Sequence, residues 1–100
     1  MMDIITDGPV LILIGDFDVR STWEVRNALH DRLARFDDVV VDLGAVDTVD
    51  LTALKVLAAA THWAQAQGRR VTLRGCCPAV RRMLHLTRLS RVVEVERASA

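Results

Sequence analysis

The sequence predicts a mixed α/β fold with the element order β-β-α-β-α-β-α-β. Three observations lead to this prediction. Short apolar runs rich in branched residues alternate with longer stretches of helical periodicity, Gly and Pro residues separate these stretches, and a tight turn joins the first two apolar runs. Strands that alternate with helices form a largely parallel sheet with right-handed crossovers. The opening hairpin makes the sheet mixed.

The N-terminal segment supplies this hairpin. Ile4 and Ile5 predict a short first strand, and residues 7–9, Asp-Gly-Pro, predict the turn. The continuous apolar run at residues 10–14 ends at Gly15. Its length and branched residues favour a second strand that is buried on both faces.

A first helix is predicted over residues 21–36, after a loop at residues 16–20. Ser21 and Glu24 have the spacing of a capping box, in which each side chain bonds to the backbone of the other residue. The apolar stripe of the helix consists of Val25, Ala28, Leu29, Leu33 and Phe36. Trp23 lies off this stripe, which favours partial exposure and a role at an interface, but packing in the core fits the sequence equally well.

The middle of the chain predicts a strand and a long helix. Residues 39–43 form a second buried strand, and a short loop follows Gly44. Asp50 is a good N-cap for a helix over residues 51–67, which is apolar nearly all round. Gly68 is placed to end this helix in the left-handed conformation.

Three shorter elements complete the pattern. The alternation at residues 70–74 predicts a strand with one face in water. Pro78 fits the first turn of a third helix, and residues 92–95 predict a short last strand. We therefore expect residues 1–100 to form a single domain, a size that its apolar half can support.

Composition narrows the function. The formal net charge is zero and no basic stripe is visible, which argues against nucleic-acid binding. No apolar run is long enough to span a bilayer and no signal peptide is visible, so we expect a cytoplasmic protein without a membrane partner. The adjacent pair Cys76 and Cys77 does not form a disulfide framework, and the three His residues lack metal-ligand spacing. We expect no metal and no cofactor.

An open α/β sheet usually binds its ligands at the carboxyl ends of the strands. Three segments should meet there: residues 16–21, 44–52 and 75–78. They bring carboxylates and hydroxyls together, namely Asp16, Asp18, Asp47, Thr48, Asp50 and Thr52. A phosphate would be favoured at the start of the second helix. On spacing alone, however, caps and turns also select these residue types.

The order of three motifs resembles the STAS family (sulfate transporter and anti-sigma factor antagonist). Residues 39–54, VVVDLGAVDTVDLTAL, are similar to its V-V-L-D-L-S-x-V strand followed by I-D-S-S-G-L. Residues 15–18, GDFD, are similar to its G-x-L-D, and residues 77–89 are similar to its S-P-A-V-R-R-V-L-E-L-T-G-L helix. The resemblance spans almost the whole chain. It implies a bacterial anti-sigma factor antagonist that regulates transcription, as in stress responses, and that is not an enzyme.

The resemblance also implies a partner and a switch. In the family, an anti-sigma factor that is a serine kinase phosphorylates the first serine of D-S-S-G, and the added charge releases the complex. Asp50 matches the Asp of this motif, Leu51 the first serine, Thr52 the second and Ala53 the glycine. Leu51 has no hydroxyl, so the usual phosphate acceptor is missing. The switch is therefore expected to be altered or absent.

The candidate site residues follow from this match. The expected partner-binding residues are Asp18, Thr48, Asp50, Leu51, Thr52 and Ala53. Thr52 is a candidate phosphate acceptor, and Thr48 is a weaker one. Resemblance to the family leaves room for a phosphatase as a further partner.

The sequence also allows other functions. Cys76 and Cys77 at a helix start are candidates for a redox-sensing thiol, against ordinary packing and capping roles. The same strand-end surface could serve a STAS-like module that binds a nucleotide or an apolar molecule, or a scaffold subunit. No nucleophile–base pair that would indicate catalysis is visible.

Overall fold

A computed structural model describes residues 2–95 of the chain. It confirms the predicted mixed α/β fold and the predicted order of strands and helices. The elements are β1 (Met2–Asp7), β2 (Val10–Phe17), α1 (Thr22–Arg35), β3 (Asp38–Val49), α2 (Leu51–Ala66), β4 (Arg70–Arg74), α3 (Pro78–Leu86), the 3-10 helix η1 (Leu89–Arg91) and β5 (Glu94–Val95).

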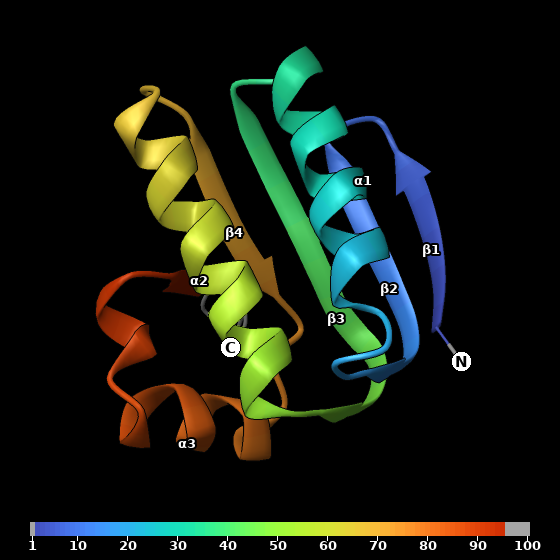
Figure 1. Cartoon of the computed structure of the whole chain (residues 1–100), viewed down its shortest axis with the longest axis vertical. Helices are drawn as coiled ribbons and strands as arrows, with labels where there is room; N and C mark the ends of the chain where they lie inside the picture. The colour runs from blue at the N-terminus through green and yellow to red at the C-terminus, as the bar shows by residue number, and fades with distance from the viewer. Residues whose placement is uncertain (1, 96–100) are drawn as a thin grey trace.

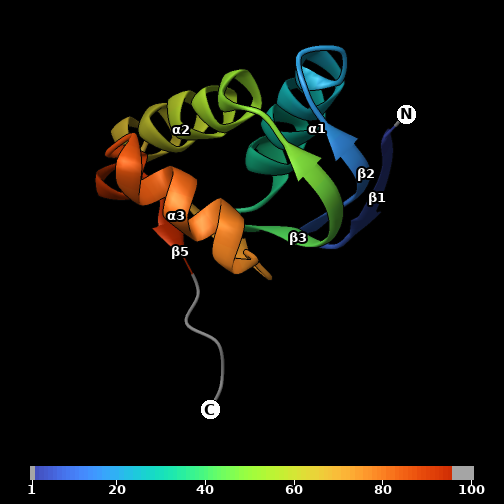
Figure 2. The ribbon, with the colours of Figure 1, turned by 90° about the horizontal axis from the view of Figure 1, so that it is seen from below.

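The sheet has the order β1-β2-β3-β4-β5, antiparallel between β1 and β2 and parallel elsewhere. From β2 to β4 each new strand is added on the same side of the last one. Right-handed crossovers in one direction place their helices on one face, so α1 and α2 lie side by side over the same face of the sheet (Figure 1). Figure 2 shows the two layers edge-on, and in Figure 1 α3 lies beyond the ends of the strands.

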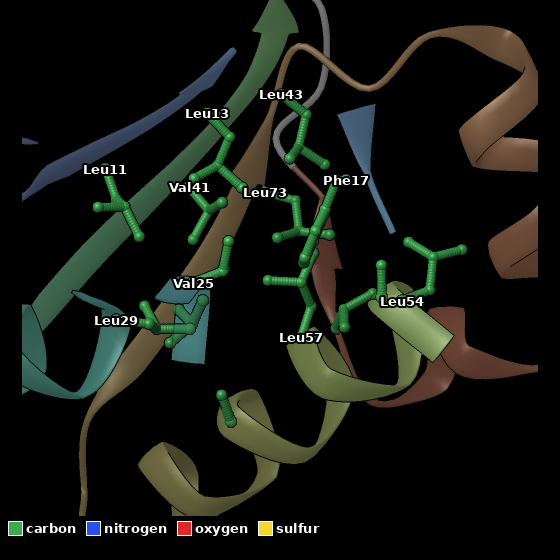
Figure 3. Close-up of a cluster of buried hydrophobic side chains, with 14 of the residues drawn as sticks. Leu11, Leu13, Phe17, Val25, Leu29, Val41, Leu43, Leu54, Leu57 and Leu73 are labelled. Carbon is green, nitrogen blue, oxygen red and sulfur yellow. The ribbon is translucent and has the colours of Figure 1, made fainter. Parts of the chain in front are cut away.

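The core lies between the sheet and these two helices (Figure 3). Leu11, Leu13, Val41 and Leu73 of the sheet, Val25 and Leu29 of α1, and Leu54 and Leu57 of α2 are all completely buried. Full burial of one such side chain stabilises the fold by about 1.5–3 kcal/mol. Phe17, the last residue of β2, is also fully buried, and it therefore fixes the end of the sheet that carries the candidate site.

The second face of the sheet corrects one prediction. Strands β2 and β3 were expected to be buried on both faces, but Ile12, Ile14 and Val40 point away from the helices and are only half-buried. Ile5, the partner of Ile12 on β1, is 49% exposed. The apolar runs predicted the strands correctly. They did not show that both long crossovers would place their helices on the same face.

The helix ends agree with most of the local signals. Gly68 follows α2 with a φ of 72°, as its predicted left-handed role requires. Pro78 begins α3, and β4 alternates between buried and partly exposed residues as expected. No helix within residues 2–95 is long and apolar enough to cross a membrane.

Candidate functional site

Strands β2 and β3 both run further than predicted, and their extra residues build the candidate site. The expected loop after Gly44 is strand as far as Val49, because it pairs with the end of β2 through two irregularities in register. This pairing sets Asp16 beside Thr48, whose hydroxyl donates a hydrogen bond of 2.8 Å to the Asp16 carboxylate. Two of the predicted site residues are thus joined across neighbouring strands.

Asp50 ties the two strand ends to the start of α2. One carboxylate oxygen accepts a hydrogen bond of 2.8 Å from the backbone N–H of Ala53, as a helix N-cap does, and this confirms its predicted capping role. The other oxygen accepts from the N–H of Val19 at 3.2 Å. The Asp50 N–H in turn donates to the carbonyl of Phe17. One side chain therefore holds both the helix start and the loop after β2.

Three residues in the first turn of α2 align with the S-S-G of the family motif, and two of them face solvent. Leu51 is 41% exposed and Thr52 is exposed, and neither side chain is held by a hydrogen bond to another described residue. Ala53 is completely buried. The prediction that Ala53 belongs to the contact surface therefore disagrees with its position, because its methyl group faces the core.

Asp18 is held within its own loop. Its carboxylate accepts hydrogen bonds from the backbone and side chain of Arg20, including an ion pair of 2.7 Å. The side-chain hydrogen bond from Arg20 is the main cause that lowers the pKa of Asp18 below its usual value. At neutral pH Asp18 is therefore an ionised residue that shapes the loop, and only about a fifth of its side chain is exposed.

The start of α1 does not form the predicted capping box. Ser21 is buried, and its hydroxyl donates to the carbonyl of Asp16 at 3.0 Å and makes no capping bond to the helix. The backbone N–H of Ser21 also donates to the carbonyl of Asp18. The Asp16 carbonyl competes for the hydroxyl, and a local spacing rule cannot detect this competitor. Glu24 points instead to a depression described below.

The third predicted segment lies against the bend of β3. Gly75 has a φ of 74°, and a Cβ atom there would lie 2.8 Å from the backbone nitrogen of Gly44. Asp42 accepts from the Gly44 N–H and from Arg74 at 2.8 and 2.9 Å, and these bonds lower its pKa, the Gly44 bond most. No hydrogen bond or ion pair among the described residues connects this segment to Asp50 or Thr52. The tightly joined part of the site therefore comes from two segments and not three.

The cysteines occupy different environments. Cys76 is buried, and this burial raises the pKa of its thiol. A raised pKa keeps the thiol protonated at neutral pH, the opposite of what a reactive thiolate needs. Cys77 is exposed at the N-cap of α3 but makes no capping bond. Redox sensing by either residue stays an untested prediction.

Two surface depressions lie beside the helices. One, of about 340 Å³, is lined by Met2, Asp16, Asp18, Arg20, Ser21 and Glu24. The other is a groove of about 300 Å³ between α1 and α2, lined by Arg26, His30, Val56, Ala59, Ala60 and Trp63. We call the second one the α1–α2 groove. Sequence reasoning missed it, because it considered the tryptophans and histidines one by one. No group of metal-ligating side chains occurs within residues 2–95.

Comparison with known proteins places this geometry in a family. The family model described as "Mlab, STAS domain" matches residues 2–94. No curated protein shows a significant sequence match to the chain.

Several solved structures share the fold at low sequence identity. TM1081 of Thermotoga maritima is 19% identical over 97% of this chain and 86% of that chain, with a TM-score of 0.77. An anti-sigma factor antagonist of Mycobacterium paratuberculosis is 22% identical over 98% and 86%, with a TM-score of 0.74.

SpoIIAA, an anti-sigma factor antagonist, matches in two chemical states. Its unphosphorylated form has a TM-score of 0.71 at 10% identity over 99% of this chain and 90% of that chain. The phosphorylated form of Bacillus SpoIIAA has a TM-score of 0.68 at 10% identity over 97% and 92%. Sequence motifs, sheet topology and the family match agree, and the chain belongs to the STAS domain family.

Proposed function

We propose that this protein is an anti-sigma factor antagonist that binds an anti-sigma factor of the serine-kinase type through the start of α2. The observation that carries the proposal is the helix start itself. Asp50 fixes it through bonds to Ala53 and Val19, and it presents Leu51 and Thr52 to solvent. A surface that is already ordered loses little conformational entropy on binding, which favours affinity.

The same residues support the second part of the proposal, that binding is not switched off by phosphorylation. Leu51 stands where the family motif has its phosphorylated serine, and its exposed side chain offers an apolar contact without a hydroxyl. Thr52 is rotated about 100° from Leu51 around the helix axis. A kinase site shaped for the first position would therefore meet Thr52 from the wrong direction. Such an antagonist would be controlled by its abundance or by a different signal.

The partner-binding residues in this proposal are Asp18, Thr48, Asp50, Leu51 and Thr52. Leu51 and Thr52 would contact the partner directly. Asp50, with Thr48 and its partner Asp16, would hold the surface in shape. A non-enzymatic regulator in the cytoplasm fits these features, and a phosphatase has no role if the switch is absent.

Isothermal titration calorimetry tests the proposal. The protein is titrated against each anti-sigma factor kinase encoded in the same genome, with and without ATP. We expect one kinase to bind with similar affinity in both conditions. Loss of that binding with ATP would overturn the constitutive part of the proposal. Failure of every kinase to bind would overturn the function.

A second candidate function rests on the depression beside β1. Its volume of about 340 Å³ is within the range of small-ligand sites. Its three carboxylates, Asp16, Asp18 and Glu24, disfavour the phosphates of a nucleotide and favour a cationic ligand. A thermal-shift screen with organic amines and nucleotides distinguishes this module from a pure protein binder, because a specific ligand raises the melting temperature. If the protein is a scaffold subunit, neither organic amines nor nucleotides should raise its melting temperature.

A further inference from the structure

The surface that leads away from the start of α2 is the α1–α2 groove. Thr52, Val56, Ala59 and Trp63 follow one another at spacings of four, three and four residues, so they form one stripe along α2. This stripe is about 17 Å long, at 1.5 Å per residue. Thr52 therefore faces the side of α2 that carries the groove, whereas Leu51 lies about 100° away.

The facing stripe of α1 is aromatic and cationic. Trp23, Arg26 and His30 have spacings of three and four residues. The guanidinium carbon of Arg26 lies 5.6 Å from the ring centroid of Trp23, and the rings of His30 and Trp63 are 4.7 Å apart across the groove. Trp23 is 67% exposed and Trp63 is 41% exposed. Exposed tryptophans are typical of binding interfaces.

Small residues make the floor of the groove. Ala60 is buried, Val56 is half-buried and Ala59 is exposed, so the small side chains that line the groove are apolar. A helix of a partner laid along the groove could pack apolar side chains against Val56 and the rings of His30 and Trp63.

Arg26 is the cationic side chain that lines the groove. Within residues 2–95, Arg26 makes no ion pair or hydrogen bond, and its guanidinium lies over the Trp23 ring. Lys55 is exposed one turn after Leu51, outside the lining of the groove, and no residue of α2 is acidic. The nearby carboxylate Glu24 lines the other depression, and Asp31 is paired with Arg32. An occupant of the groove would therefore meet the unpaired positive charge of Arg26.

We infer that the α1–α2 groove docks an acidic amphipathic helix of a protein partner. Its carboxylates would pair with Arg26, and its apolar side chains would pack on Trp63 and Val56. The inference deepens the proposed function and rests on it for the class of partner: the same anti-sigma factor would touch the start of α2 and then continue along the groove. The surface would extend from Thr52 to Trp63.

The two tryptophans of the chain provide a direct measurement. The protein is labelled with 5-fluorotryptophan, which gives two ¹⁹F resonances, and Trp23→Phe and Trp63→Phe assign them. Two peptides of 14 residues serve as probes: an amphipathic helix of Leu, Ala and Glu, and its twin with Lys in place of every Glu. The acidic peptide is expected to shift the Trp63 resonance, and this shift should weaken as salt is added.

Variants connect this shift to the groove. Arg26→Glu is expected to weaken binding of the acidic peptide about tenfold or more, as expected when a charged pair becomes repulsive. Arg82→Glu makes the same charge change on the exposed face of α3 and should alter the affinity less than about twofold, because it lies away from the groove. No shift of Trp63 at millimolar peptide, equal shifts with the Lys twin, or no effect of Arg26→Glu would each overturn the inference.

A second experiment adds the anti-sigma factor identified by calorimetry to the labelled protein. The unlabelled factor should shift or broaden the Trp63 resonance of the labelled chain, and Arg26→Glu should weaken its binding. A kinase that binds without changing the Trp63 resonance would overturn the inference and leave the proposed function intact. If no kinase binds but the acidic peptide does, the proposed function is wrong, and the inference that the groove binds an acidic amphipathic helix is supported.

Discussion

The starts of α1 and α2 face the same end of the sheet, but they are held in different ways (Figure 1). At α2, the side chain of Asp50 bonds to the helix and to the loop before α1. At α1, the side chain of Ser21 bonds back to β2 and leaves the helix start uncapped. The difference shows that Asp50 orders the candidate surface, while Ser21 secures only the strand-to-helix connection.

The largest effect is expected at Asp50. Asp50→Ala removes the cap of α2 and the bond to Val19, so the free energy of unfolding should fall by about 1–2 kcal/mol, measured by urea denaturation. Asp50→Asn keeps an acceptor at the N-cap and should cost clearly less. Equal losses for the two variants would mean that the charge, and not the cap, matters at this position.

Ser21 and Glu24 form the matched test at α1. Ser21→Ala removes the buried bond to the Asp16 carbonyl and should cost about 1 kcal/mol. Glu24→Ala should change stability by less than about 0.5 kcal/mol, because Glu24 makes no capping bond. If both substitutions cost the same amount, the predicted capping box forms after all and the comparison between the two helix starts breaks down.

A smaller effect is expected at the join between β2 and β3. Thr48→Val removes the exposed hydrogen bond to Asp16 and should lower the free energy of unfolding by about 0.5 kcal/mol. Binding of the anti-sigma factor should weaken only slightly, because Asp50 still fixes the start of α2. Loss of binding without loss of stability would instead show that Thr48 touches the partner.

The smallest effect concerns the loop before α1. Arg20 lowers the pKa of Asp18 in the folded protein, so this pair contributes stability above the pKa of the unfolded chain, near 3.9, and the contribution disappears as the pH falls through the folded pKa. In Arg20→Ala, the pKa of Asp18 should rise. Carboxyl ¹³C NMR measures this pKa, and an unchanged value would show that Arg20 does not hold the loop.

Sequence reasoning predicted the α2 start better than the α1 start, and the reason is physical. Asp50 caps the helix next to it, so a local pattern is enough. The bond of Ser21 depends on where β2 ends, and the strand at residues 44–49 depends on pairing with β2. Gly44 and the polar pair Asp47 and Thr48 suggest a loop until that pairing is known.

The α1–α2 groove shows the same limit. The sequence left both exposure and core packing open for Trp23, and its relation to Trp63 depends on how two helices pack. The motif of the STAS family did locate the start of α2 and the missing hydroxyl at Leu51. Contacts between distant segments, which build the rest of the surface, are beyond such a motif.

The central claim is that Leu51 leaves a docking surface without its switch. Intact-mass spectrometry tests this claim on three samples: the unmodified protein, the Leu51→Ser variant and the Thr52→Ala variant. Each is incubated with ATP and the anti-sigma factor kinase that binds the protein. We predict no added phosphate on the unmodified sequence or on Thr52→Ala, and one phosphate on Leu51→Ser together with release from the kinase. One phosphate on the unmodified sequence that Thr52→Ala removes would contradict the account.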